Sequence, residues 1–217
     1  MGSQQTRFHL RRYGTRRKKS FFSSLLIALV ISLASEALSA PFHPATEVIE
    51  NLHAALLTVM MDGERLGYRG RYEQLFPVVK SSFDLPFVAG TVMGRYWDEL
   101  KGDEKTRFIE EFSKLTIATY AANFDSYSRE RFEMVSQKEL STGRMEIKTK
   151  LVKSDGEQVS LDYILRNLGN EWRIINIIAN GVSDLALKRA DYTSYLKSKG
   201  FDALLAKLRE KTLEYSR

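Results

Sequence analysis

The sequence predicts an α+β fold, in which a curled antiparallel four-stranded meander packs against several amphipathic helices and encloses an apolar cavity. Apolar residues recur at helical spacing in the first half of the chain and again near its C-terminus. Between residues 131 and 180 they alternate with polar residues, which is typical of half-buried strands. There Gly143, Gly156, Gly169 and Gly181 mark turns at nearly equal intervals, as in a meander of adjacent antiparallel strands.

Residues 1–37 predict a secretory signal peptide. A basic stretch ending at Lys19 precedes an uncharged apolar run over residues 21–34, and small side chains at Ser35 and Ala37 fit cleavage after Ala37. An uncleaved N-terminal anchor is the alternative, although the apolar run is short for a hydrocarbon core of about 30 Å. We expect one domain over residues 38–217, with a helical part over 44–130, a sheet over 131–180 and C-terminal helices over 184–216.

The net charge of +6 comes entirely from the signal-like segment. That segment holds seven basic residues and one acid, whereas residues 38–217 hold 26 of each. A neutral body has no overall attraction for phosphate backbones, so the composition argues against nucleic-acid binding. Because the chain has no cysteine, a disulfide framework, a thiolate metal site and a cysteine nucleophile are excluded.

The helical part is expected to hold three segments. The first begins at Pro44 and ends at the glycines that start with Gly63, and a second, short one surrounds Pro77 before a turn over residues 83–86. A longer helix follows Gly102, with Asp103 as its N-cap. This helix carries an aromatic stripe that fits either an ordinary core or one wall of a lipid pocket: Phe108, Phe112 and Tyr120.

Four strands are expected, around residues 132–136, 145–151, 159–165 and 171–178. In the last strand the pattern places Trp172, Ile174, Asn176 and Ile178 on one face, and Ile175 and Ile177 on the other. We therefore expect this strand to be covered on both sides. The two helices that close the chain carry a surplus of basic residues, which indicates a solvated face or, alternatively, a docking surface.

No linear motif of a hydrolase, a metalloenzyme or a nucleotide-binding enzyme occurs in the sequence. The exported part has two histidines, His43 and His53, and neither stands in a catalytic pattern. We therefore expect a protein that is not an enzyme and holds no metal and no cofactor. A trough-shaped sheet facing aromatic helices can instead bind an apolar ligand without any catalytic residue.

Several short motifs keep a fixed order along the chain: Gly94-Arg95-Tyr96-Trp97, Arg107-Phe108 with Phe112, Leu115 and Tyr120, Asp155-Gly156, and Trp172 with Gly181-Val182-Ser183. Over about residues 45–215 this order resembles the MlaC/Ttg2D family, the periplasmic phospholipid-binding components of an ABC-type lipid transport system. Phe83-Asp84, residues 119–124 and residues 181–187 resemble the hopanoid-associated HpnM branch more closely. Asn176 and Asp184 depart from the commoner residues of the family.

The resemblance implies a periplasmic shuttle that carries a phospholipid or a hopanoid between an outer-membrane lipoprotein complex and an inner-membrane MCE-domain transporter. Arg95 and Arg107 would meet the lipid headgroup at the rim of the cavity, or would form surface ion pairs instead. The lipid-binding residues would come from the inward face of the sheet and from the aromatic stripe: Met145, Ile147, Tyr163, Leu165, Trp172, Ile174, Phe108, Phe112 and Tyr120.

Two other interpretations stay open. A cone-fold enzyme, an isomerase or a tailoring enzyme for a polycyclic substrate of hopanoid metabolism, would place a carboxylate or a tyrosine with a strongly perturbed pKa deep in the cavity. An anchored interaction module would have a filled core and no cavity.

Overall fold

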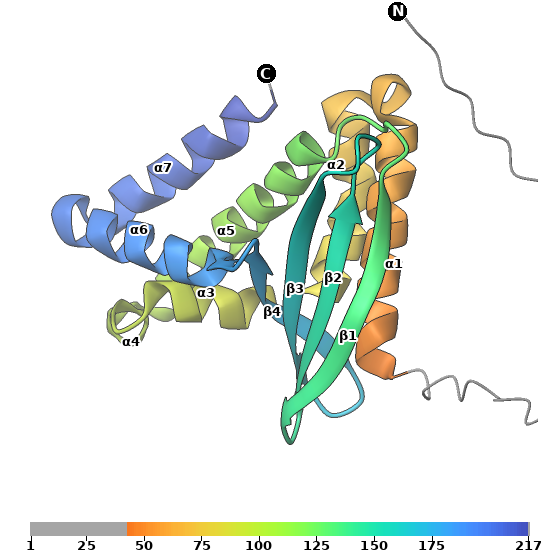
Figure 1. Ribbon diagram of the computed structural model, residues 1–217. Coiled ribbons are helices and arrows are strands. Elements are labelled where there is room, and N and C mark those ends of the chain that lie inside the picture. The colour runs from red at the N-terminus through yellow and green to blue at the C-terminus, as the bar shows by residue number, and fades with distance from the viewer. Residues whose placement is uncertain (1–42, 217) are drawn as a thin grey trace, which may run out of the picture. The chain divides into compact units, whose positions relative to one another are not determined.

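Seven helices and a five-stranded antiparallel sheet make up residues 43–216, which are the residues that the computed structural model describes (Figure 1). The predicted signal peptide lies outside these residues. In chain order the elements are α1 Pro44–Met61, α2 Gly63–Ser82, α3 Leu85–Met93, α4 Tyr96–Glu99, α5 Gly102–Asn123, β1 Arg131–Ser141, β2 Arg144–Val152, β3 Gln158–Asn167, β4 Trp172–Ala179, β5 Val182–Ser183, α6 Asp184–Lys199 and α7 Phe201–Glu214. Within the described part of the chain, no helix combines the length and the apolar character that crossing a bilayer requires.

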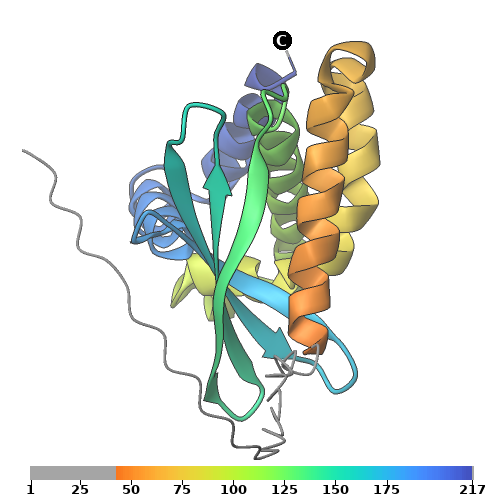
Figure 2. The ribbon, with the colours of Figure 1, turned by 45° about the vertical axis from the view of Figure 1, so that its right-hand side comes forward.

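The first two helices form an antiparallel pair, and α1 lies alongside β1 (Figure 2). His43 caps α1 by accepting the Ala45 N–H at 3.2 Å, and the Thr46 hydroxyl donates to Gln137 of β1 at 2.7 Å. The second helix is longer than the short segment predicted around Pro77. Gly67 has a φ of 57°, so α2 is kinked at this residue. The glycine-rich stretch therefore lies within a bent α2.

A buried arginine fastens this helical pair to the end of α5. Arg71 is 8% exposed, and its guanidinium donates to the Ala121 carbonyl at 2.8 Å and to the Gly63 carbonyl at 2.9 Å. Gly63 lies so close to the chain after α5 that a Cβ atom there would sit 1.9 Å from the Asp125 carbonyl oxygen. At this position in the α1–α2 junction, only glycine is small enough to pack against the chain after α5.

The sequence did not predict α3 or α4, and the N-cap of α5 lies two residues before the one expected. Residues 83–86 start a helix instead of forming a separate turn, because Asp84 caps α3 by accepting the Phe87 N–H at 3.1 Å. The N-cap of α5 is Lys101 and not Asp103, because the Glu104 carboxylate accepts the Lys101 N–H at 2.8 Å. Asp103 lies in the first turn, where a carboxylate still favours the helix dipole.

The predicted four-stranded meander is confirmed, and the two-residue β5 extends it to the order β1-β2-β3-β4-β5. One part of the face assignment is wrong. Leu165 pairs with Ile174 and Tyr163 pairs with Ile177, so β4 has a bulge at Ile175. Because directly paired residues point to the same side, the bulge brings Ile177 to the face of Tyr163 and transfers Asn176 and Ile178 to the other face.

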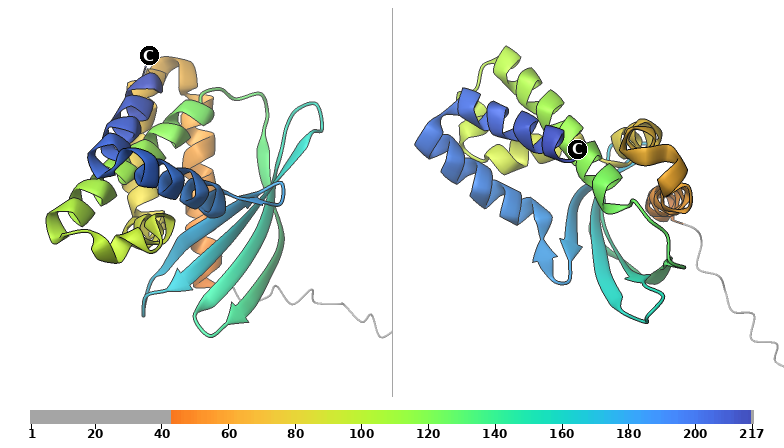
Figure 3. Two further views of the ribbon diagram at one scale, coloured as in Figure 1. Left: turned by 90° about the vertical axis from the view of Figure 1, so that its left-hand side faces the viewer. Right: turned by 90° about the horizontal axis from the view of Figure 1, so that it is seen from above.

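The remaining helices gather apart from α1 and α2, although α5 packs on both α2 and α7 (Figure 3). The predicted C-terminal helices are confirmed as α6 and α7, with Ser183 capping the first and Gly200 in a left-handed conformation between them. Strand β4 contacts α1 and α2 of one group and α3 and α6 of the other. This contact with both groups agrees with the expectation that β4 is covered on both sides.

Candidate functional site

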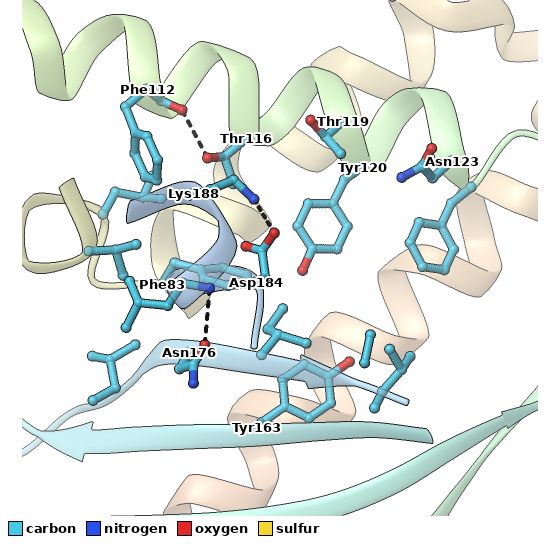
Figure 4. A pocket seen from close by; sticks show the side chains of 18 of the residues that line it. Phe83, Phe112, Thr116, Thr119, Tyr120, Asn123, Tyr163, Asn176, Asp184 and Lys188 are labelled. Atoms are coloured by element: carbon cyan, nitrogen blue, oxygen red, sulfur yellow. Dashed lines mark hydrogen bonds and ion pairs between the residues drawn. The ribbon is translucent and has the colours of Figure 1, made fainter. Parts of the chain in front are cut away.

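A pocket of about 310 Å³ lies between the sheet, α5 and the first turn of α6 (Figure 4). Its walls are mainly aliphatic and aromatic. The apolar side chains that line it are Phe83, Leu85, Val88, Phe112, Tyr120, Phe124, Leu151, Val159, Leu161, Tyr163, Ile175, Ile177, Ala179 and Leu185.

One face of α5 forms the upper wall in Figure 4, because residues three and four apart on a helix lie on the same side. Thr116 and Thr119 belong to this face, and their hydroxyls donate to carbonyls of their own helix at 2.8 Å in both cases. These hydroxyls therefore do not need a partner in the pocket. The Tyr120 ring projects from α5 into the pocket and packs 5.8 Å from the rings of Phe83 and Phe124.

Two cross-strand pairs of the sheet form the opposite wall: Leu161 with Ala179, and Tyr163 with Ile177. The bulge at Ile175 brings Ile177 into this wall. Without it, the alternation of β4 would have placed a polar asparagine, Asn176, beside Tyr163. The bulge therefore places Ile177, and not Asn176, beside Tyr163, although Asn176 still lines the pocket.

The floor of the pocket is electrically neutral. The Tyr163 hydroxyl lies 3.0 Å from His53 Nε2 on α1, and the imidazole stacks on Phe132 with ring centroids 3.8 Å apart. Burial lowers the pKa of His53 to about 3 and raises the pKa of Tyr163 above its usual value. At neutral pH both groups are therefore uncharged.

We expect the buried imidazole to make the fold acid-sensitive. In the unfolded chain His53 takes up a proton near pH 6.5, whereas in the folded protein it does so only near pH 3, so the unfolded state binds more protons between these values. Its contribution to stability is complete above pH 6.5 and is lost as the pH falls toward 3. Lowering the pH from about 7.5 to about 5 should cost about 2 kcal/mol through this residue.

The measurement is urea unfolding at both pH values for the wild-type protein and for His53→Gln, whose side chain does not titrate and can still hydrogen-bond Tyr163. The variant should lose about 2 kcal/mol less than the wild type on acidification. Equal losses in the two proteins would show that the imidazole is protonated at similar pH in the folded and unfolded states.

Charged groups lie only at the α6 side of the pocket. Asp184 forms an ion pair with Lys188 one turn later, and the Asp184 side chain is half exposed. The Asn176 side-chain oxygen accepts hydrogen bonds from the Ser183 hydroxyl at 3.1 Å and the Leu185 N–H at 3.3 Å, which fixes the start of α6 against β4. Among residues 43–216, no group of three histidine, aspartate or glutamate side chains is arranged to hold a metal ion.

Comparison with known proteins identifies the family. Residues 50–210 match the family model described as MlaC protein. The chain belongs to the MlaC family.

Two curated relatives support this assignment at low identity. The "Intermembrane phospholipid transport system binding protein MlaC" of Haemophilus influenzae is 24% identical over 131 residues, and "Toluene tolerance protein ttg2D" of Pseudomonas putida is 22% identical over 132 residues. The first match covers 58% of this chain and the second 60%, and each covers 61% of the relative, so the chain spans about three fifths of the length of these relatives.

The fold has a counterpart among solved structures. A phospholipid-binding protein from Ralstonia solanacearum, solved in complex with a phospholipid, superposes with a TM-score of 0.71 at 16% sequence identity. The match covers 81% of this chain and all of the other. At this identity the likeness shows that the two chains share a fold.

Three of the nine lipid-binding residues predicted from the sequence pattern line the pocket: Phe112, Tyr120 and Tyr163. The other six lie outside the lining. Phe108, Met145, Ile147, Leu165 and Ile174 are buried in the core, and Trp172 is half-buried with its ring 5.0 Å from that of His43. The cross-strand row formed by Met145, Leu165 and Ile174 is packed at its end by Phe83, which pairs with Ile174.

Neither of the two predicted rim arginines lines this pocket. Arg107 pairs with Asp202 of α7 at 2.9 Å on the surface, which is the alternative that the sequence left open. Arg95 lies in the turn between α3 and α4, where its guanidinium donates to the Tyr96 hydroxyl at 3.1 Å.

Most of the residues that line this pocket were not predicted from the sequence. Leu151, Val159 and Leu161 stand in the alternating pattern of β2 and β3, so their inward direction was readable from the sequence. What the pattern could not show was which end of each strand remains uncovered by helices. Nothing in the sequence pattern indicated that Ala179 and Leu185 line the pocket, because their position in its wall depends on the β4–β5 turn.

Proposed function

We propose that this protein is a lipid shuttle that holds an acyl chain of a phospholipid in the pocket between α5 and the sheet. The observation that carries the proposal is the lining of the 310 Å³ pocket, which is mainly apolar, with charged groups only at the α6 edge and the polar side chains of Thr116, Thr119 and Asn123 on α5. Membership of the MlaC family and the fold shared with a protein solved in complex with a phospholipid support it.

The chemistry of the walls suits a hydrocarbon chain. Each methylene group moved from water into such a pocket contributes about 0.8 kcal/mol, so even part of an acyl chain gains several kcal/mol before the costs of binding. The threonine hydroxyls on α5 bond to their own helix, and the Tyr163 hydroxyl is paired with His53, so a hydrocarbon would displace none of these hydrogen bonds.

The size of the pocket sets a condition on this function. Its volume is at the lower end of the range of about 300–1,000 Å³ found for small-molecule sites. We therefore propose that it receives part of one acyl chain as it stands, and that a whole phospholipid enters only when α5 or the first turn of α6 moves away from the sheet. The headgroup would remain at the Asp184 and Lys188 side.

The enzyme interpretation has no support from the pocket chemistry. The buried phenols of Tyr120 and Tyr163 have raised pKa values, mainly because of burial, so neither acts as a base at neutral pH. The carboxylate that lines the pocket, Asp184, is half exposed and paired with Lys188. A deep carboxylate of the kind that proton transfer requires is not among the lining residues.

The finer features of the function rest on the sequence resemblance. We propose a periplasmic location after export, a phospholipid as cargo, and delivery between an outer-membrane lipoprotein complex and an inner-membrane MCE-domain ABC transporter. A hopanoid is the alternative cargo, because residues 119–124 and 181–187 resemble the hopanoid-associated branch. The rigid rings of a hopanoid would need a wider opening of the pocket than an acyl chain does.

The test is transfer of lipid between two vesicle populations. Donor vesicles contain a fluorescent phospholipid together with a quencher, and acceptor vesicles contain neither, so fluorescence rises when lipid leaves the donor. The purified chain should accelerate this rise in proportion to its concentration, and unlabelled phospholipid should compete. An unchanged rate would contradict the proposal, whereas competition by hopanoid and not by phospholipid would reassign the cargo.

A further inference from the structure

A second pocket, of about 440 Å³, lies between the end of α3 and helix α6 and shares no lining residue with the first. It is polar and basic where the first is apolar. Its lining residues are Gly94, Arg95, Tyr96, Arg189, Thr193, Ser194 and Lys197.

Three cationic side chains meet at this pocket from two separate segments. Arg95 comes from the α3–α4 turn, and Arg189 and Lys197 come from α6, where their spacing of eight residues places them on one side of the helix. Within residues 43–216 none of the three forms an ion pair. The acids of α6 are already engaged, because Asp184 pairs with Lys188 and Asp191 pairs with Lys207.

The two guanidinium groups are exposed, and each lies close to residues of the α3–α4 turn. Gly94 has φ of 57°, and a Cβ atom on it would come within 3.0 Å of Arg189 Nη2, so a glycine lets the guanidinium lie directly against the α3–α4 turn. Arg95 lies over the Tyr96 ring with 5.0 Å between its guanidinium carbon and the ring centroid, and it donates to the Tyr96 hydroxyl. The Arg95 side chain is thus partly oriented before any ligand arrives.

We propose that this pocket binds a phosphate group, and specifically that of an anionic phospholipid headgroup at a membrane surface. Guanidinium groups match the oxygens of a phosphate in pairs, and Lys197 adds a third positive charge. The Tyr96 hydroxyl accepts from Arg95 and can donate its own proton to a phosphate oxygen. The same ligand chemistry is available from free inorganic phosphate, which the test includes.

A headgroup source fits the position of the pocket on α6. The first turn of this helix supplies Leu185 and Lys188 to the apolar pocket, and its next turns supply Arg189 and Lys197 to the basic one. A membrane phosphate bound at the basic pocket would therefore bring the helix that borders the lipid pocket to the bilayer. The preference for a lipid source rests on the proposed shuttle function, whereas phosphate binding itself does not.

The test is co-sedimentation of the full chain with vesicles of phosphatidylcholine alone and of phosphatidylcholine mixed with phosphatidylglycerol. The wild-type protein should bind only the mixed vesicles. Each basic residue at an anionic surface contributes about 1 kcal/mol, so the double variant Arg95→Ala/Arg189→Ala should bind them about 30-fold more weakly. The control Arg65→Ala/Arg69→Ala removes two surface arginines of α2 and should bind like the wild type.

The outcomes separate the sources of the phosphate. If the wild-type protein binds inorganic phosphate, measured by calorimetry, but binds neither kind of vesicle, the pocket would be assigned to free phosphate and the headgroup source would be overturned. Two results would overturn the phosphate site itself. In the first, the two double variants bind the mixed vesicles equally well. In the second, the wild-type protein binds soluble polyglutamate as well as it binds the mixed vesicles. The assay measures binding to the membrane surface, so its result does not depend on whether the apolar pocket holds a lipid. A native mass spectrum of the double variant Arg95→Ala/Arg189→Ala would show separately whether that pocket is loaded.

Discussion

Ala179→Phe is expected to abolish the binding of lipid in the apolar pocket. Ala179 pairs with Leu161 across the sheet and lines the pocket from the end of β4. A phenyl ring at this position would occupy space that an acyl chain needs, in a pocket of only about 310 Å³. Overpacking of a filled core typically costs about 1–3 kcal/mol of folding free energy. Because Ala179 faces an open volume, the phenyl ring should cost about 1 kcal/mol at most.

The matched control is Ile178→Phe on the same strand. Ile178 pairs with Asp162 and Ser183, points to the other face because of the bulge, and does not line the pocket. Native mass spectrometry of both variants should show a bound lipid on Ile178→Phe and the polypeptide mass alone on Ala179→Phe. Equal lipid occupancy in the two variants would place the cargo somewhere other than this pocket.

Gly63→Ala is expected to destabilise the folded protein by about 3 kcal/mol. The new methyl group would lie 1.9 Å from the Asp125 carbonyl oxygen, so the α1–α2 junction or the chain after α5 would have to move. This movement would also strain the hydrogen bond from Arg71 to the Gly63 carbonyl, and a buried guanidinium without its partner is costly. Urea unfolding followed by circular dichroism measures the loss.

Gly102→Ala is the control for the loss of a helical glycine. Gly102 opens α5, and no atom lies within 4 Å of the position that its Cβ would take. Its substitution should change the free energy of unfolding by no more than about 0.5 kcal/mol, or stabilise the protein slightly by restricting the unfolded chain. If both variants lost the same stability, the close contact at Gly63 would not explain its effect.

Most of the helices and all four long strands were predictable because they depend on local periodicity, whereas the short helices α3 and α4 were not predicted. The alternation over residues 131–180 gave the meander and its turns, and the helical spacing of apolar residues near the C-terminus gave α6 and α7. The errors at the starts of α3 and α5 arose from local caps by Asp84 and Glu104 that the apolar periodicity does not show, whereas others arose where a contact distant in sequence decides the local structure. The bulge at Ile175 is one example, since nothing in the pattern of β4 alone distinguishes an extra residue from a regular strand.

The candidate site was predictable only in part, for the same reason. Phe112, Tyr120 and Tyr163 stand in strong periodic patterns and do line the pocket. Met145 and Leu165 stand in equally strong patterns, yet they are buried in the packed core and do not line the pocket. Periodicity predicts which side chains point inward, whereas the place where helices leave the sheet uncovered depends on the packing of α5 and α6.

The presence of lipid on the purified chain tests the central claim most directly. The full chain, purified without detergent or organic solvent after export, would be measured by native mass spectrometry and then extracted for lipid analysis. We expect a folded protein carrying one phospholipid, which is released on unfolding. A folded chain that shows only its polypeptide mass, and that stays unloaded after incubation with phospholipid vesicles, would contradict a lipid-carrying function for the pocket.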